Sequence, residues 1–179
     1  MYGLVHRAVE DMAVLAGGPG LWERIRLLAG LEEASFQSMT SYPDELTYRL
    51  VGAAAQVLEL PPEEVLRRFG RHWIVYTGRE GYGPLMTMAG STLPAFLRNL
   101  DAMHARVAVT MPGLRPPSFV VTELADDLLV VEYRSTREGL EPMVLGLLEG
   151  LAESLQTPAE VTLEPVQPGS AARFLVRHG

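Results

Sequence analysis

Apolar residues recur at helical spacing through the first part of the chain. Stripes with intervals of three and four residues predict helices over residues 2–15, 44–58 and 62–75. A further stripe starts at the capping pattern Ser91-Thr92-Leu93-Pro94 and predicts one helix that runs to about Val107. Glycine- and proline-rich segments separate these stripes, as is usual where helices end. The chain is therefore predicted to be helical as far as about residue 111.

Beyond residue 112 the pattern changes to short runs of β-branched and other apolar residues, which are typical of strands. These predicted strands cover residues 118–122, 128–136, 160–166 and 172–177, with one buried helix over 142–155. The elements together predict an α+β fold with a single domain, residues 1–179. In it, an N-terminal helical subdomain (about 1–111) packs on a C-terminal subdomain (about 112–179) with an antiparallel sheet and helices.

Three polar residues occupy every second position near the end of the second predicted strand. They are Tyr133, Ser135 and Arg137. Because side chains of a strand alternate between its faces, all three are expected to project from one side. A phenol, a hydroxyl and the planar fork of a guanidinium form a cradle suited to a carboxylate or a phosphate.

Composition and charge restrict the possible partners. The absence of cysteine excludes disulfides, thiolate catalysis and cysteine-ligated metals. A net charge of −7 without a basic run argues against nucleic acid or an anionic membrane as the main partner. No apolar run approaches the roughly 18 residues that cross a bilayer, and the N-terminus lacks the features of a signal peptide. We expect a cytoplasmic protein whose partner is a small molecule or another protein.

His104 is the histidine whose position is most informative. It falls on the apolar stripe of the predicted helix 91–107, so its imidazole is predicted to point into the core. Two interpretations follow: a core histidine satisfied by its neighbours, or a nitrogen ligand for a heme iron in an apolar cleft. His6 is predicted to face solvent, His72 lies late in a helix, and His178 is next to last. No histidine pair has metal-ligand spacing, and the sequence contains no hydrolase or P-loop motif.

His104 on an apolar helix, a later double proline and then the pattern Y-x-S-x-R together make the chain resemble a known family. It resembles the heme nitric-oxide/oxygen-binding (H-NOX) family, which includes the heme domain of soluble guanylate cyclase. Y-x-S-x-R alone is a loose pattern, whereas the ordered set of matching segments is highly specific and covers essentially the full length. Those segments are Met1 to Val5, Tyr48 to Ala54, Glu80 to Gly83, Leu100 to His104, Leu114 to Pro117, Tyr133 to Leu140 and Gly146-Leu147.

The resemblance implies a heme b cofactor, iron protoporphyrin IX, between the two subdomains. His104 would be its proximal axial ligand. Tyr133, Ser135 and Arg137 would bind the two propionates, in agreement with the anion cradle inferred from the residues themselves. Pro117 matches the proline that presses on the macrocycle and distorts it.

The resemblance also suggests which gases bind. Relatives that bind oxygen place a distal tyrosine on the helix after Y-x-S-x-R, and the equivalent residue here is Met143, whose thioether donates no hydrogen bond. The other residues expected on the distal side are Met1, Val5, Trp73 and Leu147. The indole N–H of Trp73 either points at the ligand or packs edge-on and fills the pocket. We therefore expect nitric oxide and carbon monoxide to bind and oxygen to be excluded.

The function implied by the resemblance is a gas sensor and not an enzyme. Nitric oxide would weaken the bond from iron to His104, the heme would relax against Pro117, and the helix carrying His104 would shift. A separate signalling protein, such as a histidine kinase or a cyclic-diguanylate enzyme, would detect that shift. Alternatives are an oxygen-binding heme protein, a heme enzyme, for which Val5, Met143 and Leu147 supply no acid–base group, and a heme-free module that binds a carboxylate at Arg137.

Overall fold

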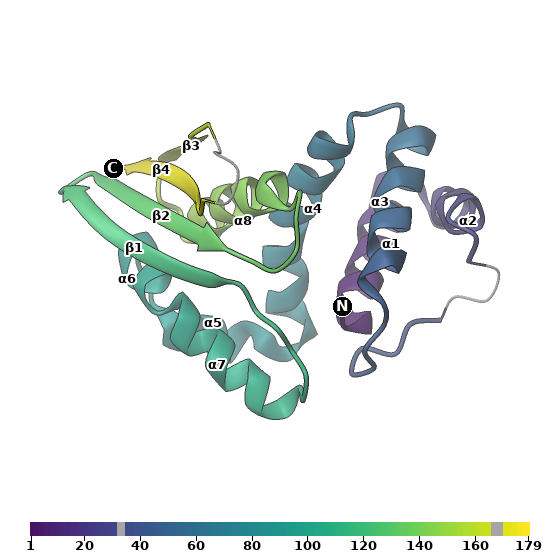
Figure 1. The fold of residues 1–179 in the computed structure, drawn as a ribbon, viewed down its shortest axis with the longest axis horizontal. Coiled ribbons are helices and arrows are strands. Elements are labelled where there is room, and N and C mark those ends of the chain that lie inside the picture. Colours follow the sequence, from purple (N-terminus) through teal and green to yellow (C-terminus); the bar gives the residue numbers. More distant parts are fainter. Residues whose placement is uncertain (32–34, 166–169) are drawn as a thin grey trace.

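The chain folds into a helical half followed by a half built on a four-stranded sheet, in a computed structural model that describes residues 1–31, 35–165 and 170–179 (Figure 1). The predicted α+β class is confirmed. Eight α-helices lie in these described ranges, with one short π-helical turn, η1. They are α1 Gly3–Gly17, α2 Pro19–Leu28, α3 Asp44–Leu58, α4 Pro62–Thr77, η1 Gly78–Tyr82, α5 Gly83–Ala89, α6 Leu93–Arg98, α7 Leu100–Thr110 and α8 Glu141–Ser154.

One predicted helix is divided into two, α6 and α7, at Asn99. The amide Nδ2 of Asn99 donates to the carbonyl of Ala89 at 2.8 Å, and its backbone (φ −95°, ψ 3°) leaves the helical region. The same residue ends α6 through its N–H and starts α7 by accepting from the N–H of Met103. Because the contact that holds Asn99 comes from another helix, the apolar stripe alone gave no sign of the break.

The sheet has the strand order β1-β2-β4-β3, and every neighbouring pair is antiparallel. Its strands are β1 Ser118–Ala125, β2 Leu128–Arg134, β3 Ala159–Leu163 and β4 Ala172–His178. β2 ends two residues before its predicted end because its ladder partners end there: Arg134 is opposite Ser118, and Tyr133 is opposite Ala172. Val166, the predicted end of the third strand, lies outside the described residues.

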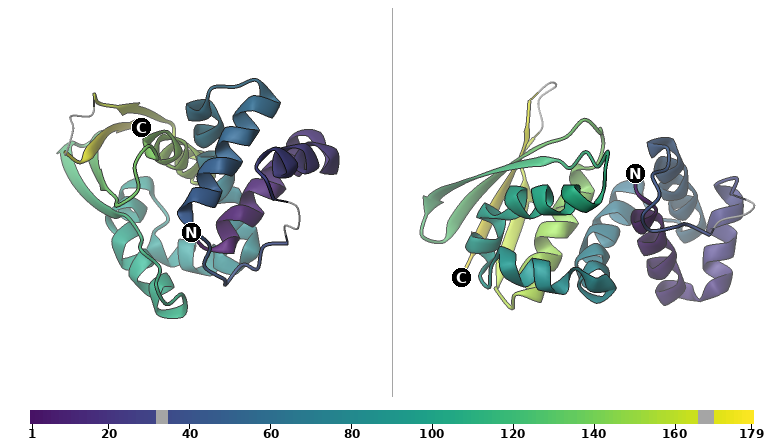
Figure 2. Two further views of the ribbon diagram at one scale, coloured as in Figure 1. Left: turned by 45° about the vertical axis from the view of Figure 1, so that its right-hand side comes forward. Right: turned by 90° about the horizontal axis from the view of Figure 1, so that it is seen from below.

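Two hydrophobic clusters form the core. The first lies among α1 to α4 and includes Leu50 and Phe69. The second lies between the sheet and the helices α6 and α8, and includes Phe96 and Phe174. Figure 2 shows the same division from two further directions, with the sheet and its helices on one side and α1 to α3 on the other.

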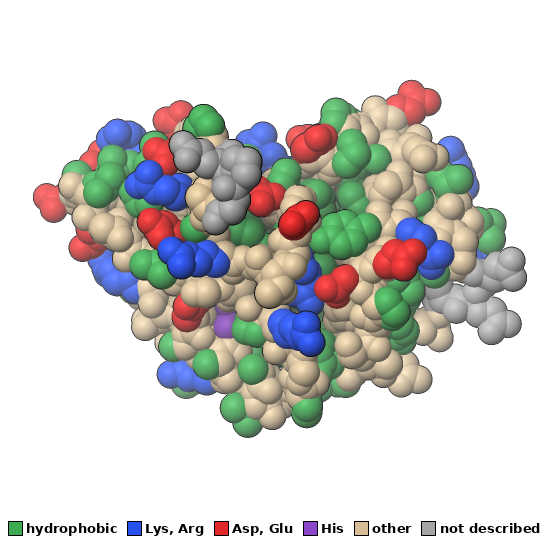
Figure 3. All heavy atoms as spheres, viewed as in Figure 1, with side chains coloured by type: hydrophobic (Ala, Val, Ile, Leu, Met, Phe, Trp, Pro, Cys, Tyr) green, Lys and Arg blue, Asp and Glu red, His purple; other side chains and the backbone are tan. Residues whose placement is uncertain are grey.

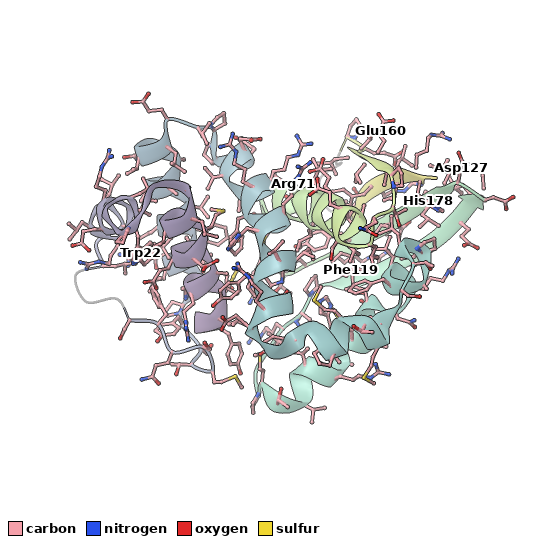
Figure 4. All side chains as sticks on the ribbon, turned by 180° about the vertical axis from the view of Figure 1, so that it is seen from behind. Trp22, Arg71, Phe119, Asp127, Glu160 and His178 are labelled. Atoms are coloured by element: carbon pink, nitrogen blue, oxygen red, sulfur yellow. The ribbon has the colours of Figure 1, made fainter. Side chains whose placement is uncertain are left out.

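Helices α4 and α8 join the two halves with their backbones in direct contact. A Cβ atom on Gly70 would collide with the backbone of Met143, and one on Gly146 would collide with the carbonyl of Arg67. The side chains of Arg67 and Arg71, the latter labelled in Figure 4, both donate to the carboxylate of Glu149 on α8, with Nε to Oε2 distances of 2.9 Å. Close packing and ion pairing thus fix this helix pair.

The surface carries charges of both signs. On the face shown in Figure 3, acidic and basic side chains are interspersed. Among the helices of the described part of the chain, none is both long and apolar enough to cross a membrane.

Candidate functional site

A cavity of about 560 Å³ lies between the two hydrophobic clusters, bordered by residues from both. The structure brings together at this cavity all ten residues singled out in the sequence. They are Met1, Val5, Trp73, His104, Pro117, Tyr133, Ser135, Arg137, Met143 and Leu147. Its volume is within the roughly 300–1,000 Å³ of small-molecule sites.

His104 borders the cavity and is not enclosed in a solid core as the stripe predicted. α7, which carries it, has no fully buried residue. The imidazole lies against the ring of Phe119 on β1, with 5.9 Å between centroids, and within the described residues its buried Nδ1 has no hydrogen-bond partner. Burial lowers the pKa of His104, and the nearby carboxylate of Asp101 offsets only part of that effect. A neutral imidazole is the form that coordinates metals.

The three polar residues at the end of β2 meet at the cavity although the strand stops at Arg134. Ser135 and Arg137 lie in the bend that follows, where the Ser135 hydroxyl accepts from the N–H of Arg137 at 3.0 Å. Burial raises the pKa of Tyr133, partly offset by its hydrogen bond with Ser135. The Arg137 guanidinium donates from Nη1 to the carbonyl of Arg115 at 3.0 Å. The three residues border one cavity, and a bend brings them together rather than strand alternation.

Asp44 also borders the cavity and was not predicted from the sequence. Its carboxylate accepts from Arg137 Nε at 2.8 Å and from the Met1 ammonium at 2.5 Å. Burial alone would raise the pKa of Asp44, but the hydrogen bonds from Met1 and Arg137 outweigh burial and lower it. An acid in the first turn of α3 resembles ordinary helix capping in sequence, so its link to a residue 93 positions later had no sequence signal.

Residues of α1, α4 and α8 also border the cavity. Trp73 lies near Phe69 and Tyr76, with ring centroids 6.0 and 6.4 Å away. Thr77, at the end of α4, and Tyr82, at the end of η1, also border the cavity and were not predicted. The Thr77 hydroxyl donates to the Trp73 carbonyl at 2.7 Å, and burial raises the pKa of the Tyr82 phenol.

The predicted exposure of His6 is wrong. Its side chain is fully buried, Nε2 lies 2.8 Å from the Thr47 hydroxyl, and its ring lies 4.6 Å from that of Phe36. His6 lies off the apolar stripe of α1, but the segment 35–42 covers this second face of the helix, and the N–H groups of Gly3 and Leu4 donate to carbonyls of that segment. Burial first, and then the charge of the nearby Met1 ammonium, lower the pKa of His6 to about 4.

The remaining histidines lie away from the cavity lining. His72 Nε2 is 2.8 Å from a carboxylate oxygen of Asp11 on α1. His178 ends β4, where its N–H donates to the carbonyl of Asp127. Over the ranges 1–31, 35–165 and 170–179, no cluster of three or more His, Asp or Glu side chains is placed to bind a metal ion.

Comparison with known proteins gives a family match over most of the chain. The sequence profile of the family described as "Haem-NO-binding" matches residues 2–163. Soluble guanylate cyclase gcy-33 of Caenorhabditis elegans is 32% identical over 152 residues, which cover 85% of this chain and 16% of that protein. Soluble guanylate cyclase gcy-31 of the same organism is 26% identical over 93% of this chain and 24% of its own length. The chain spans about a quarter or less of these curated relatives.

Solved structures agree with the fold. A crystal structure of an H-NOX protein from S. oneidensis in the Fe(II) ligation state superimposes with a TM-score of 0.92 at 18% identity, covering 100% of this chain and 96% of that chain. An H-NOX protein from S. oneidensis in the Fe(II)NO ligation state gives a TM-score of 0.90 at 19% identity, covering 100% and 99%.

Proposed function

Because the chain belongs to the haem-NO-binding (H-NOX) family, we propose that it senses nitric oxide through ferrous heme b, excludes oxygen and signals to a separate effector. In this proposal residues 1–179 act as a single sensing domain. Carbon monoxide is a second ligand. The proposed role of this domain is sensing and not catalysis, in keeping with the haem-NO-binding family to which it belongs.

The observation that carries the proposal is the composition of the cavity between the two cores. It combines one neutral imidazole, an apolar lining and a polar rim, and a porphyrin with two propionates requires these three features. His104 would hold the iron, and Pro117 would contact the macrocycle. Tyr133, Ser135 and Arg137 would bind the propionates, with Arg137 presented by Asp44. When bound, the heme supplies a ferrous centre at which diatomic gases bind.

The proposed gas selectivity rests on hydrogen-bond donors. Met143, Leu147 and Val5 have no donor in their side chains, so a polar oxygen ligand lacks a stabilisation of about 1 kcal/mol or more. The hydroxyl of Thr77, also in the lining, already donates to a backbone carbonyl. Nitric oxide and carbon monoxide bind ferrous heme without such a donor.

The proposed output is a displacement of α7. This helix carries His104 and buries none of its residues completely, so moving it disrupts less packing than moving α4 or α8. A ligand shifts such an equilibrium only by its differential affinity for the two positions. We propose that a cytoplasmic partner, such as a histidine kinase or a cyclic-diguanylate enzyme, responds to it.

Oxygen binding is the second candidate function, favoured by two donors in the lining. The indole of Trp73 and the phenol of Tyr82 both border the cavity. Either group would stabilise bound oxygen if it pointed at the ligand.

Absorption spectroscopy separates these possibilities. The protein is loaded with heme, reduced with dithionite, desalted and divided between air and anaerobic nitric oxide. We expect a Soret band that shifts with nitric oxide and is unchanged on brief exposure to air. A stable oxygenated spectrum would favour the second candidate, and a chain that retains no heme would support the carboxylate-binding alternative.

A further inference from the structure

Tyr2 connects the start of the chain to the segment that follows the His104 helix. Its side chain is 7% exposed, and its hydroxyl donates to the carbonyl of Pro112 at 2.5 Å. The two residues are 110 positions apart in sequence. Pro112 comes two residues after Thr110, where α7 ends.

α7 is packed against both hydrophobic clusters, one at each end. Leu100 and Met103, before His104, pack against the second cluster, beside the sheet. Val107 packs against the first cluster, and Met111, just after the helix, is part of it and is 3% exposed. His104 therefore lies where the helix passes from one cluster to the other, and the Tyr2 hydrogen bond fastens the far end.

The backbone that carries Tyr2 is itself held firmly. Tyr2 forms a β-bridge with Ser41, the N–H of Gly3 donates to the Thr40 carbonyl at 2.8 Å, and the N–H of Tyr42 donates to the Met1 carbonyl at 2.8 Å. The position of the Tyr2 side chain is thus fixed by the hydrogen bonds of its own backbone and its neighbours. Hydrogen bonds weaken steeply once donor and acceptor separate or lose alignment, so a small displacement of the α7 end breaks this contact.

We propose that the hydrogen bond from Tyr2 to Pro112 is the latch that couples the position of α7 to the N-terminal helices. Tyr2 is a positioning residue in this scheme: it borders the cavity, but its hydroxyl is directed to the carbonyl of Pro112. In the ligand-free protein it holds the end of α7 against the first cluster, and displacement of α7 releases it. The inference rests on the proposed function and adds to it the residue through which the helix shift reaches α1.

Tyr2→Phe tests the latch because it removes only the hydroxyl. The measurement is amide hydrogen exchange over residues 111–115 in the heme-loaded protein, with and without nitric oxide. In the wild type we expect nitric oxide to speed exchange there. In Tyr2→Phe, exchange without ligand should already be about tenfold faster, as for the loss of one buried hydrogen bond, and nitric oxide should add little.

Tyr48→Phe is the matched control. Its hydroxyl also donates to a backbone carbonyl of the other half, that of Glu138 at 3.0 Å, but at the loop after β2. This variant should keep wild-type exchange at 111–115. Met111→Val, which trims the docked side chain and leaves the hydroxyl of Tyr2 in place, provides a second variant and should speed exchange in the same direction.

The outcomes distinguish the latch from the sensing function. Wild-type exchange and an unchanged nitric oxide response in Tyr2→Phe, with a normal Soret shift, would overturn the latch and leave the sensor intact. A wild-type protein without a nitric oxide Soret shift would instead overturn the sensor. Equal effects of Tyr2→Phe and Tyr48→Phe at 111–115 would show general loosening and also overturn the latch.

Discussion

The imidazole of His104 is held at the cavity by packing rather than by hydrogen bonds. Phe119 supports one side of the ring, and burial keeps it neutral. The apolar stripe and the family resemblance both pointed to this residue. Alternation along a strand pointed to Tyr133, Ser135 and Arg137, and the other six predicted residues came from the resemblance alone. The sequence did not identify Asp44, because an ion pair between α3 and the bend after β2 depends on the tertiary fold.

His104→Gly should abolish tight heme retention, because the side chain that would hold the iron is removed. Imidazole added to the buffer should restore part of the binding, since it can enter the space left by the ring. The Soret absorbance that survives gel filtration, with and without imidazole, is the measurement. His72→Gly, the same change on a helix but outside the lining, should retain heme normally; an unchanged spectrum in His104→Gly would rule out the ligand assignment.

Met143→Tyr should add oxygen affinity. A phenol at this position would supply the donor that the thioether lacks, and a buried hydrogen bond is worth about 1 kcal/mol, or roughly fivefold in affinity. Oxygen titration of the reduced protein measures the effect. Met143→Phe controls for ring size, and equal oxygen affinity in the two variants would show that residue 143 does not face the ligand.

His6 should make stability depend on pH. Its pKa falls from 6.5 in the unfolded chain to about 4 in the folded protein, so between these values the unfolded state binds more protons. The contribution of His6 to the free energy of unfolding is therefore at its maximum above about pH 6.5. It decreases as the pH drops toward 4, by about 3 kcal/mol in total. Urea unfolding between pH 4.5 and 7 should give a flatter profile for His6→Gln, and an identical slope would contradict the assignment.

At the level of elements, the predictions succeeded where local signals set the boundary. α3 covers the predicted residues 44–58, and α4 begins at the proline expected in a first helical turn. The predicted boundaries were wrong where a contact with another element decides where a helix or strand ends. Asn99 divides a helix through its contact with Ala89, and β2 ends where β1 and β4 stop pairing with it. Such contacts depend on the tertiary fold, and the local pattern of apolar and polar residues carries no information about them.

The close contact between α4 and α8 can be tested by adding a methyl group to one of its glycines. Gly146→Ala places a methyl group against the Arg67 carbonyl, so the helices must separate, and we expect a loss of about 3 kcal/mol in unfolding free energy. Gly52→Ala is the control, because its methyl group meets open space on α3 and should stabilise by up to about 1 kcal/mol. Chemical denaturation of both variants measures the difference, and similar stabilities would show that α4 and α8 adjust at little cost.

At the scale of the whole molecule, the cavity lies at the junction of the two cores, and the family resemblance had implied a heme between the two subdomains. The contact from Arg137 to Asp44 crosses this junction and unites the predicted cradle with the start of α3. This arrangement could not be predicted from hydrophobic periodicity. Periodicity shows which face of a helix is apolar, but it does not show which other element packs against that face.

Arg137→Ala should both weaken heme binding and weaken the contact between the two halves of the molecule. It removes the donor to Asp44, the donor to the Arg115 carbonyl and the proposed propionate contact, so heme should be lost at least about tenfold faster. Transfer of heme to apomyoglobin measures the rate. Arg134→Ala removes a nearby arginine whose side chain is 69% exposed, and equal rates in the two variants would remove Arg137 from the site.

The ion pairs that join distant segments have a consequence for alkaline solution. The chain contains no lysine, and the basic side chains that pair across the two halves, such as Arg137 with Asp44 and Arg67 with Glu149, are arginines. A guanidinium keeps its proton well above the pH near 10.4 at which a lysine ammonium loses it. Burial also raises the pKa of Tyr133 at the cavity. The ion pairs between the two halves should therefore stay charged even near pH 10.4, where a lysine-based pair would begin to fail.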